Sequence, residues 1–388
     1  MTGFALARIG LSGCLAAAVL CFAMPPAQGA PYTALKLVPD AVRVFEAGQS
    51  GCDTYRIPAL AITAKGTLLA FCEARWLSGS DSGDIDLVLR RSVDGGLTWG
   101  PILTVADDGK DTCGNPCPIV DRRTGNIVLL FTKNDGAASE KQIVDGQAPP
   151  RTVFVSTSRD DGMTWSTPLD ISAQVGKPGW RWYATGPGHG IQLSDGRLVA
   201  PCDHTTGPNE DDMHSHVIYS DDAGVTWKIG GELEGRTNES TVVELTAGTL
   251  YLNARNYRGT NRRAYAISRD KGISWSPLAE DAALVEPVCQ ASALRLSVGT
   301  ADGKSRVLFS NPADVERRSM TVRLSYDHCK TWPVAKVLWP GPAAYSDLVE
   351  LPGGTLGCLF ECGEKNPYES IVFMPFSLGW LTDRMGPL

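Results

Sequence analysis

Alternating runs of apolar and polar residues recur along the chain, and the same turn sequence follows each of them. The runs lie at residues 85–90, 152–155, 217–219, 264–267 and 321–324. Alternation sends successive side chains to opposite faces of an extended backbone, which is typical of β-strands. The pattern therefore predicts short strands, each closed by a turn.

The turn has the frame Ser-x-Asp-x-Gly-x-(Ser/Thr)-Trp. It occurs at residues 92–99, 158–165, 220–227 and 268–275, and a fifth copy at 325–332 carries Cys329 in place of Gly. In such a turn Asp accepts hydrogen bonds from the backbone, Gly adopts a positive φ, and Trp packs beneath the strands. We interpret these copies as part of the scaffold.

A second repeat is in register with the first. A Gly-initiated strand begins at residues 66, 125, 196, 248 and 354, and residues 305–308 take the same place before the fifth turn. Six such units at this spacing predict an all-β fold, a six-bladed β-propeller. A two-sheet sandwich is the alternative, but it would not need one turn motif at matching places.

Composition and the N-terminus limit the function classes. The 388 residues carry a net charge of −7 without any basic run, so we expect no nucleic-acid partner. Residues 1–29 resemble a signal peptide: Arg8 precedes an apolar stretch that ends at Pro25, and a small-x-small cleavage site follows. We therefore expect a signal peptide at 1–29, one propeller domain at 30–388, and no transmembrane segment after the signal is removed.

Cysteines and histidines give weaker signals. Nine of the 11 Cys follow the predicted signal, and the spacing within Cys113/Cys117 and Cys358/Cys362 is too long for a bond along one strand. Disulfides and buried free thiols both remain open. His214 and His216 could share one face of a strand, but an exposed strand face explains them better, so we expect no metal.

The repeat register also predicts which side chains meet at the axis. The first strand of each blade is innermost, and its start lies at the mouth where the second strand ends. Three residues occupy equivalent places on first strands, two end second strands, and two lie in the following loops. In that order they are Arg56, Glu239, Tyr345, Arg75, Arg255, Asp81 and Arg317.

These residue types suggest a chemistry. Several guanidinium groups at one mouth would bind a planar anion such as a carboxylate, although phosphate or sulfate would also satisfy them. Tyr345 beside Glu239 pairs a nucleophile with a base, and Asp81 on a Gly- and Ser-rich loop could act as a general acid. Alternatively, Glu239 only pairs with an arginine and Tyr345 only packs in the channel.

Several motifs resemble those of one family, the exo-α-sialidases of the bacterial and lysosomal animal types. The resemblance runs from about Val44 to Leu381. The most specific feature of the resemblance is the order of four motifs along the chain: Arg-Ile-Pro first, then the motifs that contain Glu239, Arg255 and Tyr345. The matching segments are Tyr55-Arg56-Ile57-Pro58, Phe71 to Arg75 with Ser80-Asp81, residues 184–190, Asn238-Glu239, Asn253 to Asn256, and Trp339 to Ser346.

The resemblance implies hydrolysis of terminal α-linked sialic acids from glycoproteins, glycolipids or oligosaccharides, with retention, through a tyrosyl intermediate. It makes Tyr345 the nucleophile, Glu239 its base and Asp81 the acid/base. Arg56, Arg255 and Arg317 would hold the sialic acid carboxylate, and Arg75 a ring hydroxyl. Spacing from Thr321 selects Arg317, whereas spacing from residues 311–313 would select Arg318.

The resemblance leaves two alternatives: a trans-sialidase, or a propeller that binds sialoglycans without catalysis. We expect no cofactor and a monomer. We also expect export to the periplasm or medium, or to the lysosome if the source is an animal. The single Asn-x-Ser/Thr sequon, at Asn238, adjoins the proposed base, which favours a bacterial setting.

Overall fold

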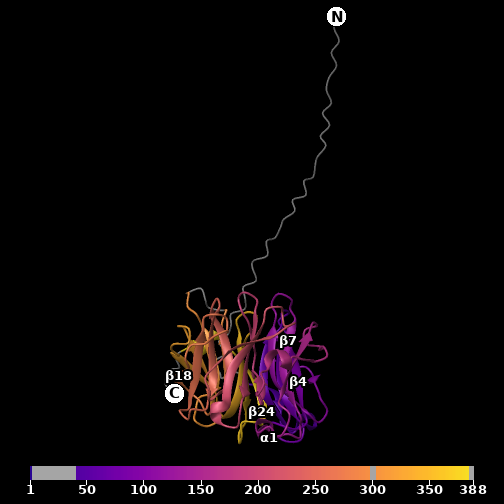
Figure 1. Cartoon of the computed structure of the whole chain (residues 1–388). Coiled ribbons are helices and arrows are strands. Elements are labelled where there is room, and N and C mark those ends of the chain that lie inside the picture. Colours follow the sequence, from indigo (N-terminus) through magenta and orange to yellow (C-terminus); the bar gives the residue numbers. More distant parts are fainter. Residues whose placement is uncertain (2–40, 298–302, 384–388) are drawn as a thin grey trace. The chain divides into compact units, whose positions relative to one another are not determined.

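Six blades of antiparallel strands surround one axis in the computed structural model, which describes residue 1, residues 41–297 and residues 303–383 (Figure 1). The predicted all-β, six-bladed propeller is confirmed. The predicted signal peptide, beyond residue 1, lies outside the described residues.

The first three blades follow one another along the chain. Blade 1 contains β2 (Thr54–Ile62), β3 (Leu68–Arg75), β4 (Ile85–Ser92) and β5 (Leu103–Ala106). Blade 2 contains β6 (Thr112–Val120), β7 (Ile127–Asn134), β8 (Thr152–Ser158) and β9 (Leu169–Asp170). Blade 3 contains β10 (Tyr183–Thr185), β11 (Ile191–Gln192), β12 (Leu198–Thr205), β13 (Met213–Ser220) and β14 (Lys228–Glu232).

Blade 4 is a sheet of its own, blades 5 and 6 share one long strand, and the first described strand joins blade 6. Blade 4 contains β15 (Thr237–Thr246), β16 (Thr249–Asn256), β17 (Arg262–Ser268) and β18 (Ala279–Val285). Blade 5 contains β19 (Ser292–Arg295), β20 (Val307–Pro312), β21 (Arg318–Ser325) and the first half of β22 (Val334–Glu350). Blade 6 contains the second half of β22, then β23 (Leu356–Cys362), β24 (Ser370–Phe376) and β1 (Val42–Glu46).

The ring is closed by β1, the first described strand, which pairs with β24 as the outer strand of the last blade. Its residues Val44 and Phe45 are buried, at 1% and 0% exposure. Main-chain hydrogen bonds and these apolar side chains thus join the two ends of the described chain. No repeat motif in the sequence marks this strand as part of blade 6.

Helices are few and short: η1 (Gln49–Gly51), α1 (Glu140–Val144), α2 (Ser172–Val175), η2 (Glu210–Asp212) and α3 (Leu378–Thr382). None of the helices in the described ranges has the length and apolar character needed to cross a bilayer. A capping box begins α1, because the Ser139 hydroxyl accepts the Gln142 N–H while the Gln142 side chain accepts the Ser139 N–H.

All five Asp turns have the same hydrogen bonds. In each, the first Ser hydroxyl accepts the N–H four residues later at 2.8–3.0 Å, and Asp accepts the following Thr or Ser N–H at 2.8–2.9 Å. Cys329 keeps this geometry at φ 63°. The bond comes from its backbone, so the fifth turn forms without Gly.

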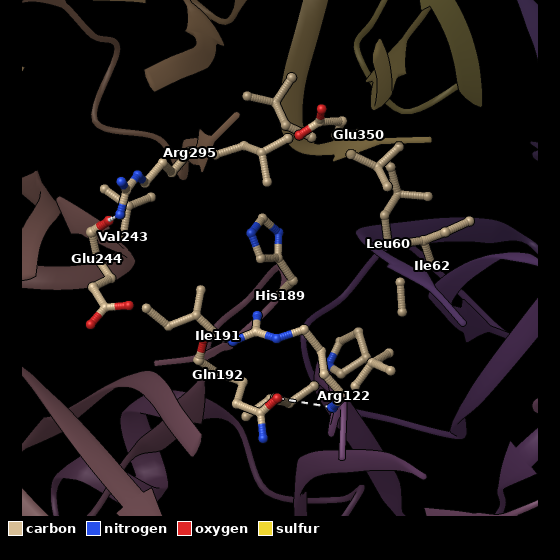
Figure 2. A pocket seen from close by; sticks show the side chains of 18 of the residues that line it. Leu60, Ile62, Arg122, His189, Ile191, Gln192, Val243, Glu244, Arg295 and Glu350 are labelled. Atoms are coloured by element: carbon tan, nitrogen blue, oxygen red, sulfur yellow. Dashed lines mark hydrogen bonds between the residues drawn. The ribbon is translucent and has the colours of Figure 1, made fainter. Parts of the chain in front are cut away.

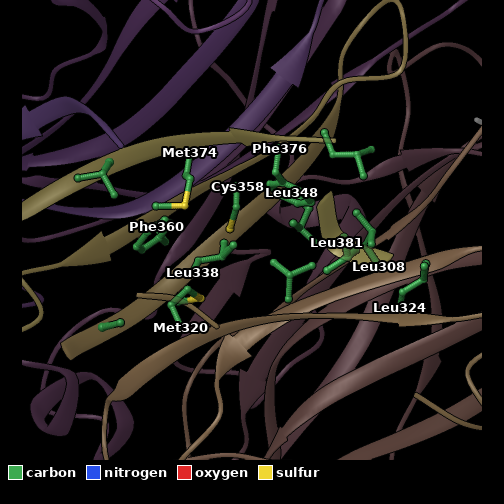
Figure 3. Close-up of a cluster of buried hydrophobic side chains, with 14 of the residues drawn as sticks. Leu308, Met320, Leu324, Leu338, Leu348, Cys358, Phe360, Met374, Phe376 and Leu381 are labelled. Atoms are coloured by element: carbon green, nitrogen blue, oxygen red, sulfur yellow. The ribbon is translucent and has the colours of Figure 1, made fainter. Parts of the chain in front are cut away.

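One buried hydrophobic cluster fills each of the six interfaces between neighbouring blades. Figure 3 shows the cluster between blades 5 and 6, where Leu308 and Met320 meet Leu348, Phe360 and Met374. Because both faces of a blade pack against neighbours, the middle strands are apolar on both faces.

All nine cysteines in the described residues are buried free thiols. Of the two possibilities that the sequence left open, disulfides and buried free thiols, the structure shows the second.

A cavity of about 600 Å³ opens where the six innermost strands end (Figure 2). Leu60, Ile191 and Val243 belong to its largely apolar wall. His189 points into its centre, with its Nδ1 2.7 Å from Asp347 Oδ1. None of the seven predicted site residues lines this cavity, so the predicted chemistry belongs to the opposite mouth.

Candidate active site

The seven predicted site residues line a single pit at the mouth where the innermost strands begin. They are Arg56, Arg75, Asp81, Glu239, Arg255, Arg317 and Tyr345. The structure therefore brings together residues from blades 1, 4, 5 and 6, as the repeat register predicted.

β-Bulges direct the innermost strands at this mouth. The pairing register shifts between Arg56 and Ala59 on β2, between Thr237 and Ser240 on β15, and between Ala343 and Ser346 on β22. A bulge breaks the regular alternation and turns a side chain to a new direction. Arg56, Glu239 and Tyr345 lie at or inside these three bulges, and all three reach the pit.

Tyr345 is held by a carboxylate and a guanidinium. Its Oη donates a hydrogen bond to Glu239 Oε1 at 2.6 Å, and Arg255 Nη1 donates to Glu239 Oε2 at 2.9 Å and to Tyr345 Oη at 3.2 Å. Burial and the charge of Glu239 raise the pKa of the Tyr345 phenol well above its usual value. The phenol therefore keeps its proton until a base removes it, and Glu239 is the carboxylate in contact.

Arginines surround the Tyr345 ring. The guanidinium carbons of Arg56 and Arg317 lie 5.1 and 5.6 Å from the ring centroid. Arg317 Nη1 donates to Tyr368 Oη at 2.7 Å, and Arg56 lies 4.1 Å from the Tyr368 ring centroid. Together with Arg255 these groups form a cationic wall that matches a bound carboxylate.

Arg318, the other arginine that spacing allowed, lies outside the pit. It forms an ion pair with Asp314 at 2.8 Å, and 55% of its side chain is exposed. It is also absent from the lining of the pit, whereas Arg317 is part of it.

Asp81 lies at the rim on the loop after β3. Its Oδ1 is 2.7 Å from Arg75 Nη1 and 4.0 Å from Arg56 Nη1, and its side chain is 63% exposed. Partial burial would raise the pKa of Asp81, but the charges of Arg75 and Arg56 outweigh it and lower the pKa below the usual value. Glu73 and the Gly79 carbonyl fix the other donors of Arg75.

The pit also contains acidic residues that sequence analysis missed. Asp203 and Glu140 both line it, and burial followed by neighbouring carboxylates raises the pKa of each. Glu361 lies behind the pit, completely buried, and accepts hydrogen bonds from Arg56 Nε and from the backbone N–H groups of Ile57 and Tyr345 at 2.8–3.0 Å.

The register contained a signal for two of these residues. Asp203 and Glu361 each follow the Gly that opens their second strand by seven residues, as Arg255 does. The second strands of blades 3, 4 and 6 thus place a charged residue at the same mouth.

Among the described residues, no group of three or more His, Cys, Asp or Glu side chains is placed to hold a metal ion.

Comparisons with known proteins find relatives of the whole described fold. A family model described as "BNR repeat-like domain" matches residues 66–358. A sialidase of Micromonospora viridifaciens is 35% identical over 401 residues, which cover 99% of this chain and 60% of that protein. An exo-alpha-sialidase of Aspergillus fumigatus is 32% identical over 366 residues, which cover 85% of this chain and 86% of that protein.

Among solved structures, the Hadza microbial sialidase Hz136 superposes with a TM-score of 0.80 at 31% identity, covering 88% of this chain and 69% of that one. This chain therefore spans most of the Aspergillus relative but less than two thirds of the length of the Micromonospora relative.

The propeller fold and these relatives place the chain in one class, the β-propeller glycoside hydrolases. Within that class, the chain belongs to the sialidase family. The resemblance found from the sequence motifs is confirmed.

Proposed function

We propose that this protein is a retaining exo-α-sialidase that hydrolyses terminal α-linked sialic acids of glycoproteins, glycolipids or oligosaccharides. The observation that carries the proposal is the 2.6 Å hydrogen bond between Tyr345 and Glu239 inside a wall of arginines. A pit that only bound an anion would need the arginines but not this pair.

Substrate binding starts with the sialic acid carboxylate. Arg56, Arg255 and Arg317 offer planar donors to its two oxygens, and burial strengthens these contacts. Glu361 fixes Arg56 before the substrate arrives, so little side-chain freedom is lost on binding. Arg75, buried and already held by Glu73 and Gly79, lines the same pit, where it would meet a ring hydroxyl.

The nucleophile follows from the substrate's charge. The anomeric carbon of sialic acid carries a carboxylate, so an Asp or Glu nucleophile would approach a like charge, whereas a neutral phenol avoids this repulsion. Tyr345 Oη forms a bond to the anomeric carbon as the bond to the aglycone oxygen breaks. Glu239 accepts the phenol proton, and Asp81 gives a proton to the departing oxygen.

The second half of the reaction restores the enzyme. Water attacks the anomeric carbon, the bond to Tyr345 breaks, and Asp81 accepts the proton of the water. Glu239 returns its proton to the phenolate. Two displacements at one carbon give net retention.

Asp81 needs a higher pKa in the substrate complex than in the free protein, because Arg75 and Arg56 keep it ionised here. A substrate carboxylate on Arg56 would neutralise part of that field, and the sugar would exclude water from the carboxyl group. Both changes raise the pKa of Asp81 toward that of a working acid.

Release of a fluorogenic aglycone from an α-sialoside tests the proposal. The wild type should release it, Tyr345→Phe should lose more than about 10³-fold in kcat/KM, and Asp81→Ala about 10²–10⁴-fold. Asp81→Ala should lose least with an acidic phenol as leaving group, because such a group needs no proton. A well-folded wild type that released nothing between pH 4 and 8 would contradict the proposal and favour a binding propeller.

We further propose that the protein is exported through the segment at residues 1–29, acts outside the cytoplasm and works as a monomer. The composition of that segment supports export. Secretion of a reporter fused behind residues 1–29, and the mass of the purified protein in solution, test these two points.

A further inference from the structure

A groove of about 540 Å³ adjoins the pit on the side of Asp81. The loop after β3, helix α1, the loop after β12 and the start of β13 form its walls. The pit and the groove have two lining residues in common, Asp81 and Glu140. The groove therefore begins at the carboxyl group that the proposed mechanism uses as its acid.

The position of the groove beside Asp81 determines which part of the substrate it can bind. An acid must contact the oxygen of the bond that breaks, so the group attached to that oxygen lies on the side of Asp81. The sialic acid itself fills the pit with the arginines. We infer that the groove binds the sugar next to the sialic acid, an inference that rests on the proposed hydrolase function.

The walls of the groove fit a sugar ring. Met213, Val144 and Pro208 supply apolar surface for the C–H face, and the hydroxyl-bearing Ser80 and Thr205 lie among the other lining residues. Binding pockets for small ligands commonly combine an apolar surface with a few placed polar groups.

The charged side chains that line the groove indicate which sugars it should favour. Glu140, Asp81 and Asp145 line the groove, and Lys141 is the single cation among its lining residues. Lys141 is paired with Asp145 at 2.5 Å, and Asp81 is paired with Arg75. Glu140 forms no ion pair with another described residue; burial and then the charge of Asp81 raise its pKa, while the charges of Arg151 and Arg255 act in the opposite direction. The side chains that line the groove thus include three carboxyl groups and one ammonium group, a surplus of negative formal charge.

We therefore propose that the groove selects a neutral hexose and disfavours an acidic one, such as a sulfated hexose or a second sialic acid. An added anion would meet Glu140, while Lys141, the one cation that lines the groove, is already paired with Asp145, and like charges brought together at a binding surface are strongly unfavourable. Because part of the groove is open to solvent, salt should weaken this selection.

A matched pair of substrates tests the proposal: an α2,3-sialyl-galactoside with and without a sulfate on galactose O6. The linkage is the same in both, so only the bulk and charge of the sulfate differ. We expect the neutral substrate to have a kcat/KM about tenfold higher at low salt, and the ratio to fall in 0.5 M NaCl. Equal values for both substrates at low salt would overturn the proposal.

Asp145→Asn separates the groove from the pit, because Asp145 lines only the groove. This change frees the charge of Lys141, so it should lower the neutral-to-sulfated ratio about threefold or more while changing kcat/KM for a small fluorogenic sialoside less than about twofold. Glu46→Gln makes the same change in net charge at an exposed position of β1 and should leave the ratio unchanged.

The outcomes also distinguish this inference from the proposed function. A wild type that hydrolyses the fluorogenic sialoside but treats both galactosides alike overturns the groove assignment alone. The same holds if Asp145→Asn changes all three substrates by one factor. A wild type inactive on every sialoside overturns the proposed function itself.

Discussion

At the scale of residues, one buried carboxylate positions two parts of the pit. Glu361 has no exposed surface, and it accepts hydrogen bonds from Arg56 and from the backbone of Tyr345. It therefore ties the arginine that would meet the substrate to the strand segment that carries the nucleophile. An uncharged group could keep the shape of these contacts but not their strength.

We predict that Glu361→Gln lowers kcat/KM for an α-sialoside by about 10–100-fold, the equivalent of weakening one charge-assisted hydrogen bond. It should also destabilise the fold by about 3 kcal/mol, because the buried Arg56 loses its partner. Since Glu361 positions rather than reacts, affinity for a non-hydrolysed sialic acid analogue should fall too. Glu364→Gln, on the exposed turn after β23, is the control; equal behaviour of the two variants would contradict the positioning role.

Arg317 and Arg318 are adjacent in sequence and form a natural matched pair. We predict that Arg317→Ala lowers kcat/KM by about 10²-fold or more, mainly through KM, because a buried charge-assisted contact to the substrate carboxylate is lost. Arg318→Ala, which removes only a pair with Asp314, should stay within about twofold. Comparable losses in both variants would show that the assignment of Arg317 is wrong.

Site residues that a strand register or a motif identifies could be predicted from the sequence, whereas those defined by their contact partners could not. Arg56, Glu239 and Tyr345 were predictable because three innermost strands place them alike. Glu361 has the register of Arg255, but its role depends on partners such as Arg56, which is 305 positions away in the chain, so the register alone did not reveal that role. Glu140 lies on α1, outside the repeating strands, so the register says nothing about it.

At the scale of elements, the Asp turns were predictable because their hydrogen bonds are local. Each connects residues at most four apart in the chain, and even Cys329 preserves them. Strand β22 was not predictable as one element. It runs through 17 residues and serves two blades, a division that depends on pairing with both β21 and β23.

The middle strands of blade 3 contain a cluster whose stability should depend on pH. His216 Nδ1 lies 3.1 Å from His204 Nδ1, and its Nε2 lies 2.8 Å from Tyr183 Oη. Two facing ring nitrogens share one hydrogen, so the two rings cannot both be protonated. Burial, with a smaller effect of Lys177, lowers the pKa of His216 to about 3, and burial also lowers the pKa of His204.

We predict that acid destabilises the protein through this cluster. An unfolded histidine titrates near pH 6.5, so the stability conferred by the neutral rings is full above that pH. As the pH falls from about 6.5 toward 3, the histidines of the unfolded chain bind protons, while those of the folded cluster stay neutral. In this range each histidine lowers the free energy of unfolding by about 1.4 kcal/mol per pH unit.

Thermal melts of the wild type and His216→Gln between pH 7.5 and 4 measure this effect. The variant should be less stable at pH 7.5, because the contact with His204 is lost, but its Tm should fall less steeply toward pH 4. His328→Asn, at an exposed histidine, should keep the wild-type slope. Parallel slopes in all three proteins would contradict the cluster as the source of acid sensitivity.

At the scale of the whole molecule, the order of the blades could be predicted, but the closure of the ring could not. Six repeats determine how many blades form. They do not say which strand completes the last blade, since β1 lies before the first repeat and has no turn motif of its own. Only its pairing with β24 reveals this role.

Closure should make the two ends of the described chain interdependent. Phe45 on β1 is completely buried, its ring centroid is 5.3 Å from that of Tyr55 in blade 1, and it belongs to the cluster between blades 6 and 1. One side chain thus contributes to the last blade and to its junction with the first. The pit is formed by other strands, so losing this side chain should affect stability more than catalysis.

We predict that Phe45→Ala lowers the free energy of unfolding by about 3–5 kcal/mol, through lost burial and the cavity left behind. Glu46→Ala, at the neighbouring exposed position, should change it by less than about 0.5 kcal/mol. Denaturant titration measures both values, and kcat/KM well below the melting temperature should stay within about twofold of the wild type, because the arginines and Tyr345 keep their supports. If Phe45→Ala unfolded at the same denaturant concentration as Glu46→Ala, the ring would not depend on β1, and blades 6 and 1 would have to be held together by β22 and β2 alone.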